Sequence, residues 1–233
     1  MHTATTATLS GSADLAASRR INRSLTARIE KRVLHWMATR TPLWINSDHL
    51  TLLGLGAQIA TGIAYAIARH HRYALVVATA CIALNWLGDS LDGTLARVRS
   101  QQRPRYGFYV DHMVDLFGAL ALIIGLGCSG FIHWPAAVAM LVAFLLLASE
   151  SYLATHTLSC FQLSQGCFGP TEIRLLLIAG NIALLRSPYA NVFGHRMLLF
   201  DLGGSIAAAA MFLIAVAVTL EHTAQLYRQE PLP

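Results

Sequence analysis

The sequence predicts an all-α integral membrane protein with six transmembrane helices, preceded by an amphipathic helix at the membrane interface. Hydrophobic residues make up 55% of the 233 residues and charged residues only 12%, and the mean hydropathy is +0.51. This composition is too apolar for an average soluble domain. Stretches of about 20 largely apolar residues, the length that crosses a bilayer core, recur between short polar connections. They do not alternate with period two, as the strands of a membrane barrel would.

Residues 1–20 are expected to form a disordered tail. They are rich in Ala, Thr and Ser, and Asp14 is their single acid, a composition that cannot pack a core. The segment lacks the apolar central region of a secretory signal peptide, so cleavage and export are not expected. An organellar presequence, which is also poor in acids, stays open as an alternative.

Residues 21–41 are predicted to form an amphipathic juxtamembrane helix. Apolar residues recur there at three- and four-residue steps, and basic residues take other positions. The apolar set is Ile21, Leu25, Ile29, Val33, Trp36 and Met37, and the basic set is Arg23, Arg28, Lys31 and Arg32. Such a helix suits the cytoplasmic headgroup region, where anionic lipid attracts it. The alternative is a soluble helix packed on another domain, but no second soluble domain is visible.

Residues 42–222 are predicted to form the membrane domain, and residues 223–233 a cytoplasmic tail. Pro42 and the polar turn Asn46-Ser47-Asp48 end the first helix and start the first span. The six spans are expected at Leu50–Ala68, Tyr73–Leu91, Val110–Phe131, Pro135–Leu153, Thr171–Leu185 and Leu202–Leu220.

The distribution of Lys and Arg predicts the orientation in the membrane. Basic residues gather before the first span, between spans two and three, and after span six; fewer lie in the connections on the other side. The first group includes Arg40, Arg97, Arg99, Arg103, Arg105 and Arg228, and the second consists of Arg69, Arg72, Arg186 and Arg196. By the positive-inside rule, both termini face the cytoplasm. We expect a multi-pass membrane protein, and the membrane expected for it is a bacterial inner membrane.

Four aspartates stand within or beside the second and third predicted spans, near a cytoplasmic loop. Asp89 and Asp92 are three residues apart, and Asp111 and Asp115 are four apart, so each pair lies on one helix face. Two adjacent antiparallel helices would aim both pairs into one pocket. Unpaired charges in a membrane are costly, and clustered carboxylates resist ionisation unless divalent cations lie between them. Carboxylate ligands favour magnesium, manganese or calcium over zinc or copper.

Other residues of this segment are suited to phosphoryl chemistry beside such metals. Arg97 is placed to hold a pyrophosphate, while Gly93 and Gly107 remove side chains where a nucleotide would approach the backbone. The full pattern reads Asp89-x2-Asp92-Gly93-x2-Ala96-Arg97-x9-Gly107-x3-Asp111-x3-Asp115. It resembles the signature of the CDP-alcohol phosphotransferases, and the resemblance covers about residues 21–220.

The resemblance implies a role for each residue of the signature. Asp89, Asp92 and Asp111 would bind Mg²⁺ or Mn²⁺, and Asp115 would also touch metal and act as the general base on the acceptor hydroxyl. The residues implied for the CDP site are Asp92, Gly93, Ala96, Arg97, Gly107 and Thr51. The alternative for the aspartates is a buried polar network that only orients the helices, but such networks normally pair acids with bases.

The predicted function is transfer of a substituted phosphate from a CDP-linked donor to an alcohol, with release of CMP, in phospholipid synthesis. CDP-diacylglycerol is the expected donor; a small CDP-alcohol with diacylglycerol as acceptor is the alternative. A membrane prenyltransferase would carry two aspartate motifs far apart. An ion or metal transporter would spread its acids through the membrane. The resemblance also implies a homodimer among membrane lipids, and nucleic acid is not an expected partner.

Two arginines are candidates for binding the acceptor. Arg174 lies within the fifth predicted span, where its charge is costly unless an anion meets it, and Arg105 lies in the second loop. Together they would clamp a phosphate-bearing acceptor in bidentate fashion. Alternatively, Arg174 reaches the headgroups or pairs with Glu150 or Glu172.

Overall fold

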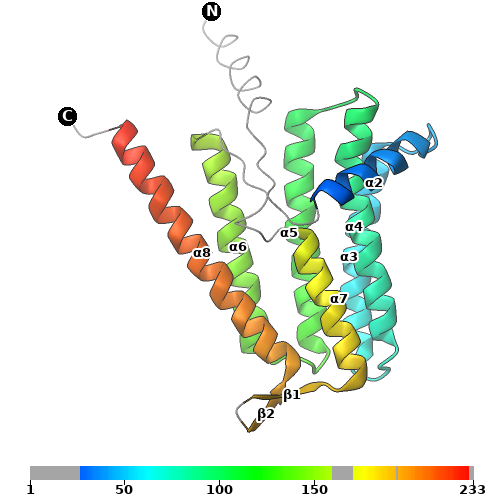
Figure 1. The fold of residues 1–233 in the computed structure, drawn as a ribbon, viewed down its shortest axis with the longest axis vertical. Coiled ribbons are helices and arrows are strands. Elements are labelled where there is room, and N and C mark those ends of the chain that lie inside the picture. Colours follow the sequence, from blue (N-terminus) through cyan, green and yellow to red (C-terminus); the bar gives the residue numbers. More distant parts are fainter. Residues whose placement is uncertain (1–26, 159–169, 193, 231–233) are drawn as a thin grey trace, which may run out of the picture.

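The computed structural model describes residues 27–158, 170–192 and 194–230. In this part the fold is helical except for one small hairpin (Figure 1). The elements are α2 (Ala27–Arg40), α3 (Ser47–Ala68), α4 (Ala74–Val98), α5 (Pro104–Cys128), α6 (Trp134–Thr157), α7 (Pro170–Arg186), β1 (Tyr189–Val192), β2 (His195–Leu198) and α8 (Leu199–Gln229). The tail predicted for residues 1–20 lies outside the described residues.

A helix occupies each of the six predicted spans, and five of these helices are long and apolar enough to cross a membrane. The exception is α7, whose 17 residues extend only about 26 Å against a hydrocarbon core of about 30 Å. The prediction of a helical protein is therefore confirmed, and five of the predicted spans are candidates for crossing a membrane. A sixth crossing by α7 stays a prediction.

The helix ends differ from those predicted because polar residues continue the helices past the apolar stretches. Helix α4 runs to Val98 and α5 begins at Pro104, so the aspartate motif lies on two helices and only residues 99–103 form the loop. Proline near the first position of α5 suits a helix start. Asn46 caps α3 by accepting the His49 amide at 3.0 Å. The predicted tail from residue 223 instead continues α8 to Gln229.

The antiparallel hairpin β1–β2 connects α7 to α8 and was not predicted. Its strands have only four residues each, and Gly194 in the turn has a φ of +83°, which glycine adopts without strain. The hairpin lies at the end of the bundle opposite the α4–α5 loop and the C-terminal end of α6 (Figure 1). One end of the bundle therefore carries the hairpin, and the other carries the α4–α5 loop.

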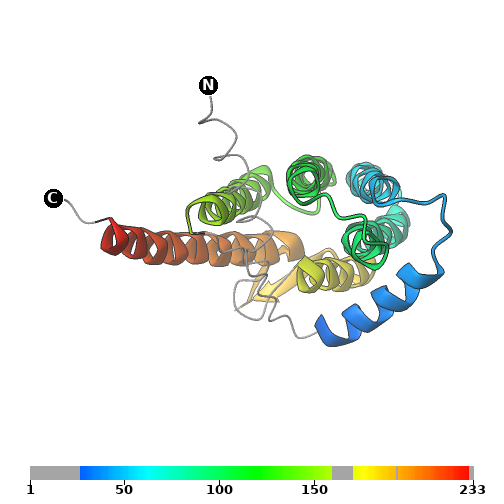
Figure 2. The same cartoon turned by 90° about the horizontal axis from the view of Figure 1, so that it is seen from above.

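The helices form two groups. Helices α4 and α5 each pack against α3, while α6 packs against α8, and α7 packs against α4. Seen from above, α2 lies across the end of the bundle rather than parallel to it (Figure 2). Figure 1 shows α7 beginning part-way along the bundle, below the ends of α4 and α5.

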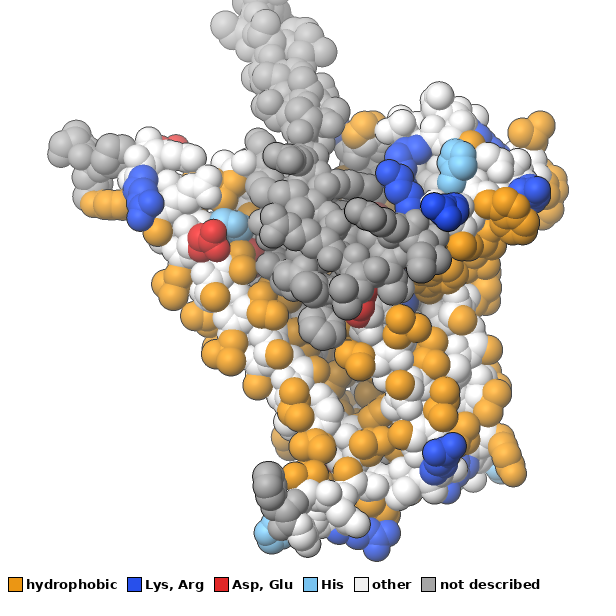
Figure 3. All heavy atoms as spheres, in the orientation of Figure 1, with side chains coloured by type: hydrophobic (Ala, Val, Ile, Leu, Met, Phe, Trp, Pro, Cys, Tyr) orange, Lys and Arg blue, Asp and Glu red, His pale blue; other side chains and the backbone are white. Residues whose placement is uncertain are grey.

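On the face shown in Figure 3, hydrophobic side chains are spread over the surface between the two ends of the bundle. In α6, only 11% of the most apolar 18-residue window is buried inside the protein. Exposed side chains such as Ile63, Leu146 and Leu213 would be costly in water but suit lipid tails. The exposed face of the described helices thus fits a multi-pass membrane protein.

Helices α3 and α5 approach closely at a pair of glycines. A Cβ added to Gly125 would lie 2.0 Å from the carbonyl oxygen of Gly62, which requires the two helices to separate. We expect Gly125→Ala to destabilise the protein by about 1–3 kcal/mol and lower its Tm in detergent. Gly56→Ala is the matched control, since nothing lies within 4 Å of its added Cβ. Equal Tm values for the two variants would contradict this packing.

Candidate functional site

The four aspartates of the motif come together in the half of the bundle that ends at the α4–α5 loop. Asp89 and Asp92 lie on α4, and Asp111 and Asp115 lie on α5. Asp115 is half-buried and interacts electrostatically with the other three carboxylates and with Arg174. The two helices pack on α3 rather than closely on each other. The carboxylates therefore form one cluster, although the prediction of two directly adjacent helices is wrong.

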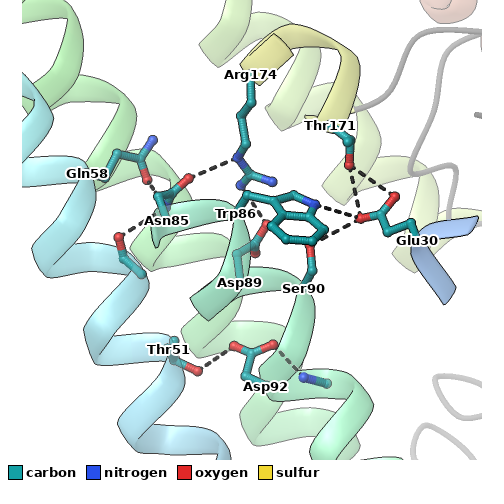
Figure 4. Close-up of polar contacts among 12 residues, drawn as sticks. Glu30, Thr51, Gln58, Asn85, Trp86, Asp89, Ser90, Asp92, Thr171 and Arg174 are labelled. Carbon is teal, nitrogen blue, oxygen red and sulfur yellow. Dashed lines mark hydrogen bonds and ion pairs between the residues drawn. The ribbon is translucent and has the colours of Figure 1, made fainter. Parts of the chain in front are cut away.

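Arg174 forms an ion pair with one aspartate of this cluster (Figure 4). Its Nη2 donates to Asp89 Oδ2 at 2.6 Å, and its Nε donates to Asn85 Oδ1 at 2.9 Å. Asn85 is buried and donates in turn to Gly54 O at 3.0 Å and Gln58 Oε1 at 3.2 Å. The arginine is thus fixed against α4 by a polar network that reaches α3.

Asp92 is the most buried of the four aspartates, with 8% of its surface exposed. Thr51 on α3 donates to its Oδ2 at 2.6 Å, and the Gly93 amide donates to its Oδ1 at 2.5 Å (Figure 4). Two donors satisfy a carboxylate that would otherwise be costly to bury. The structure therefore joins Thr51, which was predicted for the CDP site, to Asp92.

The remaining motif residues line the adjoining surface of α4 and α5. Arg97 is exposed and its Nη2 donates to Thr94 Oγ1 at 2.9 Å. A Cβ on Gly93 would lie 3.5 Å from Arg97 Nη1, whereas one on Gly107 would have no atom within 4 Å. Ala96 is half-buried beside them. Both glycines keep the backbone accessible, as expected where a diphosphate approaches.

The two arginines predicted for the acceptor are placed differently. Arg174 lies in the aspartate cluster, while Arg105 is exposed at the start of α5. Glu150, offered as an alternative partner of Arg174, instead contacts His222 Nδ1 of α8 at 2.6 Å. The structure thus brings Arg174, but not Glu150, into contact with the cluster.

The family model of CDP-alcohol phosphatidyltransferases matches residues 44–221 of the chain. The chain belongs to the CDP-alcohol phosphatidyltransferase family. This confirms the resemblance drawn from the aspartate motif. A search of curated protein sequences found no significant match.

Membership of this family implies a general type of reaction. CDP-alcohol phosphatidyltransferases transfer a phosphatidyl group from a CDP-alcohol to an alcohol, and they generally depend on a divalent metal. Membership of the family therefore favours phosphatidyl transfer over the two alternatives, prenyl transfer and ion or metal transport. The matched range begins after the end of α2.

The chemistry of the cluster fits a divalent metal. Its four carboxylates supply hard oxygen ligands of the kind that Mg²⁺ and Mn²⁺ prefer, and Arg174 is bonded to one of them. Among the described residues, no three His, Cys, Asp or Glu side chains are arranged to share one ion. Asp89 is turned toward Arg174 and Asp92 toward Thr51. The ligand assignment of the four aspartates accordingly remains a prediction.

Several residues of the site were missed by sequence reasoning. Asn85 precedes Asp89 by one helical turn, and this spacing, which places both on one face, is the sequence signal for Asn85. Glu30 of α2 contacts α4 and α7, and nothing in the local sequence indicates that contact. On α5 and α6, His112 packs edge-on against Tyr152, with ring centroids 4.5 Å apart. Tyr152 interacts electrostatically with Asp115 and Asp111, so this pair borders the cluster.

Proposed function

We propose that this protein is a metal-dependent transferase that moves a substituted phosphate from CDP-diacylglycerol to an alcohol, releasing CMP, in phospholipid synthesis. The observation that carries the proposal is the gathering of all four motif aspartates into one cluster with Arg174. A carboxylate cluster so poor in cations is costly in a membrane protein unless it serves to bind metal. It lies in the half of the bundle that ends at the α4–α5 loop, so that a lipid donor and a water-soluble acceptor entering from that end can meet there.

In this proposal, α4 and α3 hold the donor. Arg97 binds the diphosphate because its exposed guanidinium can donate several hydrogen bonds to phosphate oxygens. Gly93 and Gly107 let the nucleotide approach the backbone, and Ala96 lines the same surface. Thr51 orients Asp92 through their 2.6 Å hydrogen bond, so that one carboxylate oxygen keeps a fixed direction.

Asp115 serves as the general base. It takes the proton of the acceptor hydroxyl as the acceptor oxygen attacks the β-phosphorus of the donor. A bond forms between that oxygen and phosphorus, and the bond from phosphorus to the bridging oxygen breaks, so CMP leaves with the electron pair. Mg²⁺ or Mn²⁺, held by Asp89, Asp92, Asp111 and Asp115, would supply neutralising charge for the phosphate oxygens.

The proposal includes a cytoplasmic site in a bacterial inner membrane and a homodimer. The loop between α4 and α5 carries Arg99 and Arg103, as the positive-inside rule expects of a cytoplasmic connection. Helix α2 would lie in the adjoining headgroup layer, since Trp36 is exposed at 56% while Leu34 and Ala38 are buried against the bundle.

A CMP-release assay tests the proposal. The purified protein, with Mg²⁺ or Mn²⁺, would be incubated with labelled CDP-diacylglycerol and a panel of alcohols with and without phosphate. We expect CMP and a new phospholipid in equal amounts, with one acceptor strongly preferred. Absence of CMP release with every acceptor would reject this donor, and a small CDP-alcohol with diacylglycerol would be tried next.

Arg174→Ala is expected to raise the acceptor KM roughly 10- to 150-fold if the acceptor carries phosphate, since a lost charged hydrogen bond is worth about 1.5–3 kcal/mol. The donor KM should stay unchanged. Arg174→Lys keeps the charge but not the fork that contacts both Asn85 and Asp89, so it should recover only part of the loss. The two KM values would be measured by varying each substrate. An unchanged acceptor KM, or an uncharged preferred acceptor, would reject acceptor binding by Arg174 and leave it only a structural role in the ion pair with Asp89.

A further inference from the structure

Glu30 of α2 joins three helices through a single carboxylate (Figure 4). Its Oε1 accepts from Trp86 Nε1 at 3.0 Å and from Ser90 Oγ at 3.3 Å, both on α4. Thr171 of α7 donates through Oγ1 to both carboxylate oxygens, at 3.1 and 3.2 Å. The carboxylate thus receives donors from two different helices.

The partners of Glu30 stand beside the residues of the aspartate cluster. On α4, Asp89 lies between Trp86 and Ser90, and Trp86 and Asp89 are three residues apart. On α7, Thr171 and Arg174 are also three residues apart, so each pair shares a helix face. Helices α4 and α7 are connected directly, by Arg174 to Asp89 and Asn85 and by Asn181 to Thr79, and Glu30 adds an indirect connection at the end of α7 where Arg174 lies.

We propose that Glu30 is a positioning residue for the transfer reaction, because it fixes the spacing of α4 and α7 and thereby the direction of the Asp89 carboxylate. This inference rests on the proposed function. Helix α2 lies outside the matched range of residues 44–221, but the hydrogen bonds of Glu30 make it a structural part of the site.

The direction of the Asp89 carboxylate depends on the position of α7 relative to α4. Its Oδ2 is bonded to Arg174, which comes from α7, so a shift of α7 relative to α4 turns the carboxylate. Without Glu30, the indole N–H of Trp86 and the hydroxyl of Thr171 lose their acceptor, and half-buried donors without partners favour rearrangement. Partners that orient metal ligands typically change affinity or activity when removed.

The test compares Glu30→Ala with Glu30→Gln in the full-length protein. A glutamine oxygen still accepts from Trp86 and Ser90, and its amide can donate to the hydroxyl of Thr171. His35→Ala is the matched control, because His35 is an exposed residue of the same helix. The measurements are kcat, the KM of both substrates, and the affinity for Mn²⁺ measured from the spin-resonance signal of the free ion.

Glu30→Ala should lower kcat and Mn²⁺ affinity by roughly 10- to 100-fold, with both KM values little changed. Glu30→Gln and His35→Ala should stay near wild type. Thr171→Val should reproduce part of the loss, and adding it to Glu30→Ala should cause no further loss, because both changes break one connection.

Wild-type kcat and Mn²⁺ affinity in Glu30→Ala would overturn the proposal, as would an equal loss in His35→Ala. If wild-type protein released no CMP with any donor, the proposed function would fail, and Mn²⁺ affinity alone would decide the role of Glu30. A lowered affinity in Glu30→Ala but not Glu30→Gln would then support it, and an unchanged affinity would reject it.

Discussion

Asp115→Asn is expected to abolish transfer, lowering kcat by about 100- to 10,000-fold, which is the usual contribution of a general base. The asparagine amide cannot take the acceptor proton, but it nearly keeps the size of the aspartate. Asp89, Asp92 and Asp111 remain as carboxylates, so binding of metal and of the CDP donor should largely persist. The measurement is kcat together with the dissociation constant of the CDP donor.

Asp201→Asn is the control for this variant. Asp201 lies in the first turn of α8, beside the hairpin, and accepts from the backbone amide of His133 at 2.7 Å. It is at the opposite end of the bundle from the α4–α5 loop (Figure 1), so its replacement should leave kcat unchanged. Near-normal turnover in Asp115→Asn would show that another group removes the proton.

Removal of divalent metal is expected to have an effect at least as large. The free-energy contribution of a metal to phosphoryl transfer is several kcal/mol, so excess EDTA should lower CMP release by about a thousandfold or more. Mg²⁺ or Mn²⁺ should restore the activity, because the aspartate cluster offers hard oxygen ligands. The initial rate of CMP release would be measured before chelation, after it and after each metal is returned.

A matched experiment separates metal loss from unfolding. The Tm in detergent with and without EDTA shows whether the protein stays folded, and Asp92→Asn should weaken Mn²⁺ binding without the chelator. Undiminished CMP release in excess EDTA would contradict a metal cluster at Asp89, Asp92, Asp111 and Asp115.

The helices and the aspartate cluster could be predicted from the sequence for physical reasons. A backbone in lipid must satisfy its own hydrogen bonds, so long apolar stretches specify helices. Carboxylates three and four residues apart share a helix face, which placed Asp89 with Asp92 and Asp111 with Asp115. Helix ends were less predictable, because α4 and α8 continue through polar residues where hydrophobicity no longer marks them.

The contacts between distant residues were not predictable from spacing. Glu30 and Thr171 are separated by 141 positions, and Glu150 and His222 by 72. Each pair depends on how two helices pack against their neighbours, which the spacing of residues along one helix does not specify. The free-energy cost of a charged side chain within a membrane span marks Arg174 as unusual in the sequence. Only the fold shows that its partner is Asp89. The positions of the helices therefore followed from composition, and the connections within the site did not.

The most direct test of the transferase proposal follows the oxygen of the acceptor alcohol. An acceptor with ¹⁸O in its reacting hydroxyl would be supplied with CDP-diacylglycerol and metal, and both products would be analysed by mass spectrometry. Attack of that oxygen on the β-phosphorus predicts one ¹⁸O in the phospholipid and none in CMP. Unlabelled phospholipid, ¹⁸O in CMP or no phospholipid at all would contradict the proposed reaction.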